Sequence, residues 1–548
     1  MEGMLEAVKK VALEKFPRKS DRKIQYGTAG FRTREEYLDH VLYRMGVLAV
    51  LRSRTKKAII GAMITASHNP EEDNGIKLVD PAGEMLEASW ETHATFLANV
   101  TDEDIPSAVK TIVSQENVPM DVAASVYVAK DTRASSQRLS EAFQCGVQAA
   151  GGTCKDYGLL TTPQLHYMVR CVNSNGQYGQ ATEEGYFQKL TTAFCKLRKQ
   201  MGKKDDSSYK TALKLDTANG VGAYKAHLLT QYISDYLTID ICNDGSSGKL
   251  NYLCGADYVK VNQKPADGMT LNSNCRCASF DGDADRIVYY YADQNGTFHL
   301  MDGDKIATLV AGYLQELLNR SGLSLNLGLV QTAYANGSST VYITDTLKVP
   351  VACAATGVKH LHHRALEFDL GVYFEANGHG TVLFSANASS QIQKAATDNS
   401  LSGIQREAAV QMCTVMDLIN QTVGDAISDM LLVEVILATY GWEINNWDSA
   451  YVDLPNRQLK VKVKDRTVIT TADAERTAVT PEGLQQAVDS LVAKYKHGRS
   501  FVRPSGTEDV VRVYAEADTQ ENADKLANEV GLAVYSMAGG IGDPPKTS

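Results

Sequence analysis

An alternating pattern constrains the fold of this chain most. An apolar run typical of a β-strand, a loop rich in Gly, Asp or Asn, and a helical pattern recur along it; the apolar runs include 58–64, 125–129, 212–215 and 327–331. Strands that alternate with helices predict α/β layers, with ligands at the carboxyl ends of the strands. Because a chain of 548 residues is too long for a single hydrophobic core, we expect several such units.

Changes in composition along the chain predict four domains. A polar stretch at 172–208 is typical of a segment inserted outside the sheet and followed by a linker. A helical stretch at 404–447 leads to the last unit. The predicted domains are 1–205 with a serine loop, 206–300 with an acidic loop, 301–445 with a Gly-rich loop, and 446–548 with a basic loop.

Charge and hydropathy exclude several classes of partner. The chain has 55 Lys and Arg against 65 Asp and Glu, so its net charge of −10 disfavours nucleic acid and anionic membranes. Apolar runs such as 45–51 and 58–66 are far shorter than the roughly 20 residues of a membrane span, and residues 1–19 lack the core of a signal peptide. We therefore expect a soluble, cytoplasmic protein. A phosphorylated small molecule fits this charge if basic residues gather in a pocket.

The densest candidate site is the stretch T-A-S-H-N-P-E-E-D-N-G-I-K at 65–77. Ser67 ends an apolar strand, and Asn69, Pro70 and the acids after them predict that a helix starts here. The turn displays Ser67 either as a reactive group or merely as a helix cap. An acyl hydrolase is disfavoured because the G-x-S-x-G elbow is absent and a histidine next to the serine, His68, is no triad partner.

A second candidate is an acidic loop in which Asp281, Asp283 and Asp285 alternate with Gly and Ala. Oxygen ligands without His or Cys favour Mg²⁺ over zinc. An EF-hand is excluded because Arg286 and Ala292 occupy positions that need Gly and Glu. A solvated acidic turn is the alternative, but packing three like charges between apolar segments costs energy unless a cation joins them.

Two further loops carry groups that bind phosphate or sugar. The stretch 503–508 with Arg512 combines guanidinium, hydroxyl and backbone N–H groups, which fit a phosphate dianion or form a plain surface turn. The stretch 375–380 follows the strand 371–374, and its Glu, Asn and His either bond sugar hydroxyls or belong to an incidental Gly-rich turn. No P-loop and no G-x-G-x-x-G motif is present, which disfavours an ATP-dependent kinase.

Together these loops predict phosphoryl transfer between an enzyme serine and a phosphorylated substrate. The negative charge of a phosphoserine and three carboxylates exceeds the positive charge of one Mg²⁺, so further cations are needed. Arg32, Lys77 and Arg286 lie inside or beside the same motifs.

The motifs, in this order, resemble those of the α-D-phosphohexomutase superfamily from Tyr26 to Arg512, including G-T-A-G-F-R at 27–32 and T-G-V-K at 356–359. The resemblance implies four domains around a central cleft. Three are related α/β domains with mixed sheets, and the fourth is a smaller α+β domain that carries the phosphate loop. It also implies Mg²⁺ as the cofactor and a sugar 1,6-bisphosphate as intermediate and activator.

Within the superfamily, the stretches 64–75, 375–380 and 501–514 resemble the branch that acts on N-acetylglucosamine phosphates. Relatives acting on glucose or mannose phosphates typically have Ser where this chain has Asn377, whose amide fits an acetamido group. The implied reaction interconverts N-acetylglucosamine 6-phosphate and 1-phosphate through a phosphoserine, in the biosynthesis of UDP-N-acetylglucosamine.

The resemblance implies a role for each candidate residue. The implied metal ligands are Asp281, Asp283, Asp285 and a phosphate oxygen on Ser67. The candidates for proton transfer are Lys77 and Lys359, with His379 as the third choice. The implied substrate contacts are Glu375, Ala376, Asn377, His379, Arg503, Pro504, Ser505, Gly506, Thr507 and Arg512. The implied supporting residues are Arg32, His68, Arg133 and Arg286. We expect a phosphosugar as the partner of a monomeric chain, with no nucleic acid and no membrane.

Three rival functions make different predictions. A phosphoglucomutase-type mutase would prefer another hexose phosphate. A Mg²⁺-dependent sugar phosphatase, with a nucleophile from the Asp281 loop, would release phosphate and tolerate Ser67→Ala, although such enzymes usually have Thr or Val in place of Asp285. A nonenzymatic protein would only bind sugar phosphates.

Overall fold

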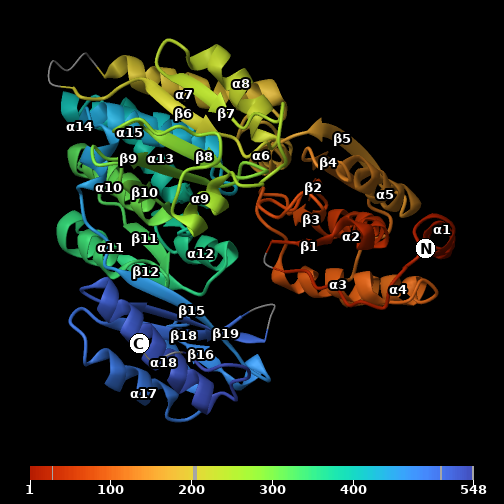
Figure 1. The fold of residues 1–548 in the computed structure, drawn as a ribbon. Helices are drawn as coiled ribbons and strands as arrows, with labels where there is room; N and C mark the ends of the chain where they lie inside the picture. The colour runs from red at the N-terminus through yellow and green to blue at the C-terminus, as the bar shows by residue number, and fades with distance from the viewer. Residues whose placement is uncertain (28, 202–206, 506–508, 546–548) are drawn as a thin grey trace. The chain divides into compact units, whose positions relative to one another are not determined.

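The computed structural model describes residues 1–27, 29–201, 207–505 and 509–545. The chain forms two compact units, coloured along the sequence in Figure 1. Unit 1 comprises 1–302, 377–381 and 413–444, and unit 2 comprises 303–376, 382–412 and 445–548. The predicted boundary at 205 lies outside the described residues.

The first sheet of unit 1 is mixed, in the order β1-β3-β2-β4-β5. Its strands are β1 Phe31–Arg34, β2 Ile60–Ile64, β3 Asp73–Val79, β4 Ser125–Lys130 and β5 Thr153–Leu159; its helices are α1 Glu2–Lys15, α2 Asp39–Lys56, α3 Ala88–Asn99, α4 Ile105–Gln115, α5 Ser136–Ala149 and α6 Thr162–Asn173. Strands β2, β4 and β5 run parallel, whereas β3 is antiparallel to β1 and β2. The central strand β2 is buried along its whole length because α2 and α6 both pack against it (Figure 1).

The prediction that a helix starts after Asn69 is wrong, because the chain continues from the serine turn into strand β3. Met63 pairs with Lys77 and Ile64 with Ile76, so the two strands form an antiparallel pair around the turn. Two ladders, to β1 and to β2, satisfy the backbone of β3. Pairing with these distant residues outweighs the local capping signal.

The second sheet of unit 1 has the order β10-β9-β8-β6-β7 and is also mixed. Its elements are α7 Glu183–Gln200, β6 Ala212–Asp216, α8 Gly222–Ile233, β7 Thr238–Cys242, α9 Ala256–Asn262, β8 Cys277–Phe280, β9 Ile287–Ala292, β10 Phe298–Met301 and α15 Ala426–Tyr440. Helix α7 packs against α8 and α15 (Figure 1). The acidic loop joins β8 to β9.

The third sheet has the order β12-β11-β13-β14, with β11 parallel to both neighbours. Its elements are α10 Gly303–Ser321, β11 Leu327–Thr332, α11 Gly337–Val341, β12 Val351–Ala354, α12 Val358–Ala365, β13 Leu370–Phe374, β14 Gly380–Phe384 and α13 Ala386–Thr397. The helices α14 Gly403–Leu418 and α16 Ile444–Asp448 lie on either side of α15 in the chain.

The fourth sheet, β15-β19-β18, is antiparallel and carries α17 and α18 (Figure 1). Its elements are β15 Asn456–Lys462, β18 Arg499–Pro504, β19 Val510–Glu516, α17 Leu484–Val492 and α18 Gln520–Met537, with a separate hairpin of β16 Thr470–Ala472 and β17 Thr477–Thr480. The predicted α/β domains with mixed sheets and the α+β C-terminal domain are thus confirmed. Among the described residues, none of the helices has both the length and the apolarity needed to cross a bilayer.

Candidate functional site

Ser67 occupies a strained turn at the carboxyl end of β2. It is buried and has a φ of 50°, a left-handed conformation that costs energy for any residue with a side chain. Its backbone N–H donates to Thr65 Oγ1 at 2.9 Å, and Thr65 Oγ1 in turn donates to Asp131 Oδ2 at 2.8 Å. The Ser67 hydroxyl donates to Asp281 Oδ2 at 2.7 Å, which joins the serine turn to the acidic loop within unit 1.

Two side chains from other elements hold the carbonyls of the serine turn. Arg133 donates to the carbonyls of Ser67, Asn69 and Pro70 at 2.9, 3.0 and 2.7 Å. Asn251 donates through Nδ2 to the carbonyls of Ser67 and Asn69 at 2.8 and 3.0 Å. These donors stabilise a turn whose backbone is unfavourable on its own.

We expect Asn251→Ala to lower kcat about 10- to 100-fold, because loss of one of the two clamps misplaces the Ser67 hydroxyl. The fall in unfolding free energy should be about 1 kcal/mol, the net contribution of a lost hydrogen bond, because Arg133 still donates to both carbonyls. Steady-state kinetics and urea unfolding measure the two effects. Asn262→Ala is the control, since its side chain is exposed and donates to the carbonyl of Tyr258 within α9. Unchanged kcat in Asn251→Ala would contradict the assignment.

Asp281, Asp283 and Asp285 form a buried cluster in which one carboxylate oxygen of each lies within 4.8 Å of the others. Asp283 Oδ1 and Asp285 Oδ1 are buried and have no hydrogen-bond partner among the described residues. Three hard oxygen donors with unsatisfied lone pairs fit Mg²⁺. Gly282 is required beside them, because a Cβ there would lie 2.6 Å from the carbonyl oxygen of Ser67.

Cations surround this cluster. Lys77 Nζ donates to Asp285 Oδ2 at 2.9 Å and to Asp283 Oδ2 at 3.2 Å, and Arg286 Nε lies 3.6 Å from Asp285 Oδ1. Burial favours neutral Lys77, but Asp283 and Asp285 raise its pKa above the ordinary value, so it carries a positive charge. Burial and the charge of Arg286 lower the pKa of Arg32, and the charges of the same aspartates oppose this decrease only in part.

Burial acts to raise the pKa of all three carboxyl groups, but neighbouring charges shift the pKa values of Asp281 and Asp285 in opposite directions. Burial and the charges of Asp285 and Asp283 raise the pKa of Asp281 well above its usual range. Burial also favours the neutral form of Asp285, yet Lys77 and then His379 hold its pKa well below the usual range. The carboxyl group nearest Ser67 is therefore the easiest of these two to protonate.

Two histidines adjoin the reacting groups. His68 Nδ1 lies 3.4 Å from Ser67 Oγ, and Arg286, burial and Arg32 lower its pKa well below the ordinary value, so the ring is neutral. His379 Nδ1 lies 2.8 Å from the carbonyl oxygen of Asp285 and donates to it. The backbone N–H of His379 donates to Asn377 Oδ1 at 3.0 Å, which uses part of the acceptor capacity predicted for an acetamido group.

Unit 2 contains the predicted phosphate loop. Arg503 on β18 and Arg512 on β19 are paired across the two strands, and each has a buried Nε with no hydrogen-bond partner among the described residues. Ser505 is buried, and its backbone N–H donates to the carbonyl of Val510 at 2.9 Å. Gly506 and Thr507 lie outside the described residues. Two facing guanidinium groups with unsatisfied donors fit an anion.

The remaining predicted residues of unit 2 lie in a helix, a loop and a strand. Lys359 is buried in the first turn of α12, which begins after Gly357. Glu375 and Ala376 follow β13, and the carbonyl of Ala376 accepts from the N–H of Gly303. Pro504 ends β18 beside Arg503.

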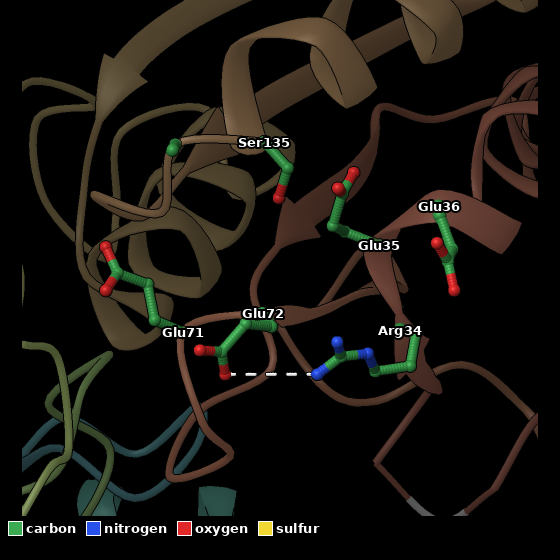
Figure 2. Close-up of a pocket in the computed structure, with 7 residues that line it drawn as sticks. Arg34, Glu35, Glu36, Glu71, Glu72 and Ser135 are labelled. Carbon is green, nitrogen blue, oxygen red and sulfur yellow. Dashed lines mark ion pairs between the residues drawn. The ribbon is translucent and has the colours of Figure 1, made fainter.

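A pocket of about 320 Å³ adjoins the serine turn but holds none of the predicted site residues. It is lined by Arg34, Glu35, Glu36, Glu71, Glu72, Ala134 and Ser135. Figure 2 shows the carboxylate of Glu72 facing Arg34, at 4.0 Å. Four glutamates against one arginine repel an anion, so this pocket is no site for a phosphosugar.

Two residues that shape the site were not predicted from the sequence, Thr162 and Asn251. Thr162 Oγ1 donates to Asp283 Oδ2 at 2.6 Å, and the T-x-x-Q capping box that starts with Thr161 was a signal for this helix terminus. No comparable sequence motif marks Asn251 as a residue of the site.

Family models match along most of the chain. Phosphoglucomutase/phosphomannomutase domain I matches 46–104 and 98–178, and the C-terminal domain matches 459–532. Phosphoacetylglucosamine mutase AMG1 domain II matches 177–288, and domain III matches 302–442.

Relatives and solved structures extend this similarity. Human phosphoacetylglucosamine mutase is 60% identical over 523 residues, which cover 95% of this chain and 96% of the relative. The structure of Aspergillus fumigatus N-acetylphosphoglucosamine mutase with GlcNAc-6P and magnesium is 46% identical, with a TM-score of 0.91 over 98% of this chain and 99% of that one. A serine-to-alanine variant of that mutase with glucose 1,6-bisphosphate has a TM-score of 0.89 and is 46% identical, over 98% of this chain and 100% of that one.

Proposed function

Because this chain belongs to the phosphoacetylglucosamine mutase family, we propose that it interconverts N-acetylglucosamine 6-phosphate and N-acetylglucosamine 1-phosphate. It is an isomerase that uses Mg²⁺ and a sugar 1,6-bisphosphate. The observation that carries the proposal is the buried Ser67 hydroxyl, which donates to Asp281 of an aspartate triad whose carboxylates pair with Lys77 and Arg286.

In the first half-reaction, phosphorylated Ser67 donates its phosphoryl group to the 1-hydroxyl of N-acetylglucosamine 6-phosphate. The bond between phosphorus and Ser67 Oγ breaks, a bond to the sugar oxygen forms, and the proton of the sugar hydroxyl passes to a basic group. The leaving Ser67 Oγ takes a proton from the Asp281 carboxyl group, which lies 2.7 Å away. Mg²⁺, when bound by Asp281, Asp283 and Asp285, neutralises charge on the transferring group. Lys77 and Arg286 add positive charge at the same place.

In the second half-reaction, the 1,6-bisphosphate has turned end for end and Ser67 accepts its 6-phosphoryl group. Asp281 is placed to accept the proton of the Ser67 hydroxyl, because the two oxygens lie 2.7 Å apart. The product is N-acetylglucosamine 1-phosphate, the precursor of UDP-N-acetylglucosamine. Since Lys77 is charged and paired with two carboxylates, its geometry favours a charge-neutralising role, and Lys359 stays the candidate for proton transfer at the sugar.

We assign the other predicted residues to substrate binding. Arg503, Ser505, Gly506, Thr507 and Arg512 would bind the phosphate that is not reacting, which orients the sugar in both half-reactions. Glu375 and Asn377 would contact the sugar, and Asn377 would favour an acetamido group. Arg133 and His68 support the Ser67 turn.

We further propose that the chain acts as a cytoplasmic monomer with domains 1–205, 206–300, 301–445 and 446–548. Every group assigned to the cycle comes from one chain, so the cycle needs no second copy. A charged phosphosugar does not cross a membrane unaided, which supports a cytoplasmic location.

Phosphorus-31 NMR tests the activity and the sugar preference together. The protein receives Mg²⁺, a trace of sugar 1,6-bisphosphate, and equal N-acetylglucosamine 6-phosphate and glucose 6-phosphate. We expect the acetamido sugar to convert faster to its 1-phosphate, without free phosphate. Faster glucose conversion would overturn the role of Asn377, and release of inorganic phosphate alone would indicate a phosphatase.

A further inference from the structure

Glu475 connects two loops of unit 2 that the sequence places far apart. Its carboxylate lies in the turn between β16 and β17, where Oε1 accepts from Arg503 Nη1 at 2.8 Å. Oε2 accepts from the backbone N–H of Thr356 at 3.0 Å and also from the Thr356 hydroxyl. One carboxylate therefore joins the phosphate loop to the loop 356–359, which leads to Lys359.

The turn that carries Glu475 is strained. Asp473, Ala474 and Glu475 have φ values of 52°, 54° and 70°, so three successive residues with side chains adopt the left-handed conformation. Such a run is unfavourable unless surrounding contacts compensate for it. The bonds of Glu475 to Arg503 and Thr356 provide that compensation.

The same contacts decide which edge of the Arg503 guanidinium is available. Glu475 bonds Nη1, and the ring of Tyr334 lies 5.7 Å from the guanidinium carbon. Nε of Arg503 is buried without a hydrogen-bond partner among the described residues, and Arg512 opposite has its Nε in the same condition. A guanidinium bonds phosphate best through two parallel N–H groups, and the edge that contains Nε is the one Glu475 does not occupy.

We propose that Glu475 is a positioning residue for phosphosugar binding, an inference that rests on the proposed function. It orients Arg503 so that the Nε edge faces the substrate phosphate, and it couples this orientation to the loop 356–359. Its negative charge also offsets the repulsion between Arg503 and Arg512, which face each other across β18 and β19.

Glutamine cannot replace this carboxylate. Arg503 and Thr356 donate to different oxygens of Glu475, and the amide of Gln puts an NH₂ group in place of one of these oxygens, so in this geometry one of the two connections is lost. Its NH₂ group then faces another donor, which separates the two loops. Glu475→Gln therefore breaks the connection with little change in side-chain volume.

The experiment compares Glu475→Gln with Asp473→Asn, a control in the same turn whose carboxylate bonds the exposed Arg476. Calorimetry measures the Kd of N-acetylglucosamine 6-phosphate and of inorganic phosphate, and kinetics give kcat and KM. For Glu475→Gln we expect the sugar phosphate Kd and the KM to rise about tenfold, with kcat within about threefold. The control should stay within about twofold of the unsubstituted protein for every constant.

Thr356→Val tests the other end of the connection and serves if Glu475→Gln fails to fold. It removes the hydroxyl donor but keeps the backbone N–H, so we expect a smaller rise in Kd, about threefold. The double variant should bind no more weakly than Glu475→Gln alone, because both changes break one connection.

Two outcomes would overturn the inference. Unchanged binding in Glu475→Gln and Thr356→Val would make the connection a static contact, and tighter binding would make Glu475 a competitor of the substrate phosphate. Failure of the proposed function is separate, since it would appear as loss of isomerisation in the unsubstituted protein while the calorimetric comparison could still be made.

Discussion

Ser67→Ala is expected to abolish the interconversion of the two sugar phosphates, with a fall in kcat on the order of 10⁴-fold or more. In the proposed mechanism both half-reactions pass through Ser67, whose hydroxyl donates to Asp281, so the variant lacks the group that would carry the phosphoryl. The measurement is the initial rate by phosphorus-31 NMR, with the Kd of N-acetylglucosamine 6-phosphate determined by calorimetry. The Kd should change little, because the hydroxyl contributes to transfer rather than to substrate binding.

Intact-protein mass spectrometry separates this expectation from a folding defect. After incubation with a sugar 1,6-bisphosphate, the unsubstituted protein should gain one phosphoryl group and Ser67→Ala none. Ser107→Ala, at an exposed position on α4, is the control and should gain the group normally. Full turnover by Ser67→Ala, with release of phosphate, would instead favour an aspartyl nucleophile in the loop of Asp281.

Asp283→Asn is expected to lower kcat by about 10²- to 10³-fold, the second largest effect. The substitution keeps the shape of the side chain but removes one of three charges from the proposed Mg²⁺ ligands, so less positive charge is held at the transferring phosphoryl group. Raised Mg²⁺ should restore part of the rate, because it offsets a weakened affinity by mass action.

Thermal unfolding supplies a readout that does not depend on turnover. Mg²⁺ should raise the Tm of the unsubstituted protein, because an ion that binds only the folded state stabilises it, and this rise should be smaller in Asp283→Asn. Asp240→Asn, at an exposed position on β7 of the same sheet, should respond to Mg²⁺ like the unsubstituted protein. An undiminished rise in Asp283→Asn would remove this residue from the metal site.

Much of the site could be predicted from the sequence because its chemistry is encoded locally. Asp281, Asp283 and Asp285 are separated by single residues, so any conformation of that loop keeps them near one another. Likewise, Arg503 and Arg512 flank one short connection between two β-type runs. The alternation of strands and helices predicted the layered fold for the same reason, since periodicity within a segment decides which face is buried.

Contacts between distant residues were decided only by the tertiary structure. The turn after Ser67 carries a helix-capping signal, yet it leads into β3, because pairing with β1 and β2 provides more hydrogen bonds than a cap does. Asn251 reaches a carbonyl 184 residues away in the chain, and Glu475 reaches Thr356 across 119 residues. Residue type and spacing thus determined which groups could react, whereas long-range pairing determined their orientation, because a hydrogen bond depends on positions that no local pattern records.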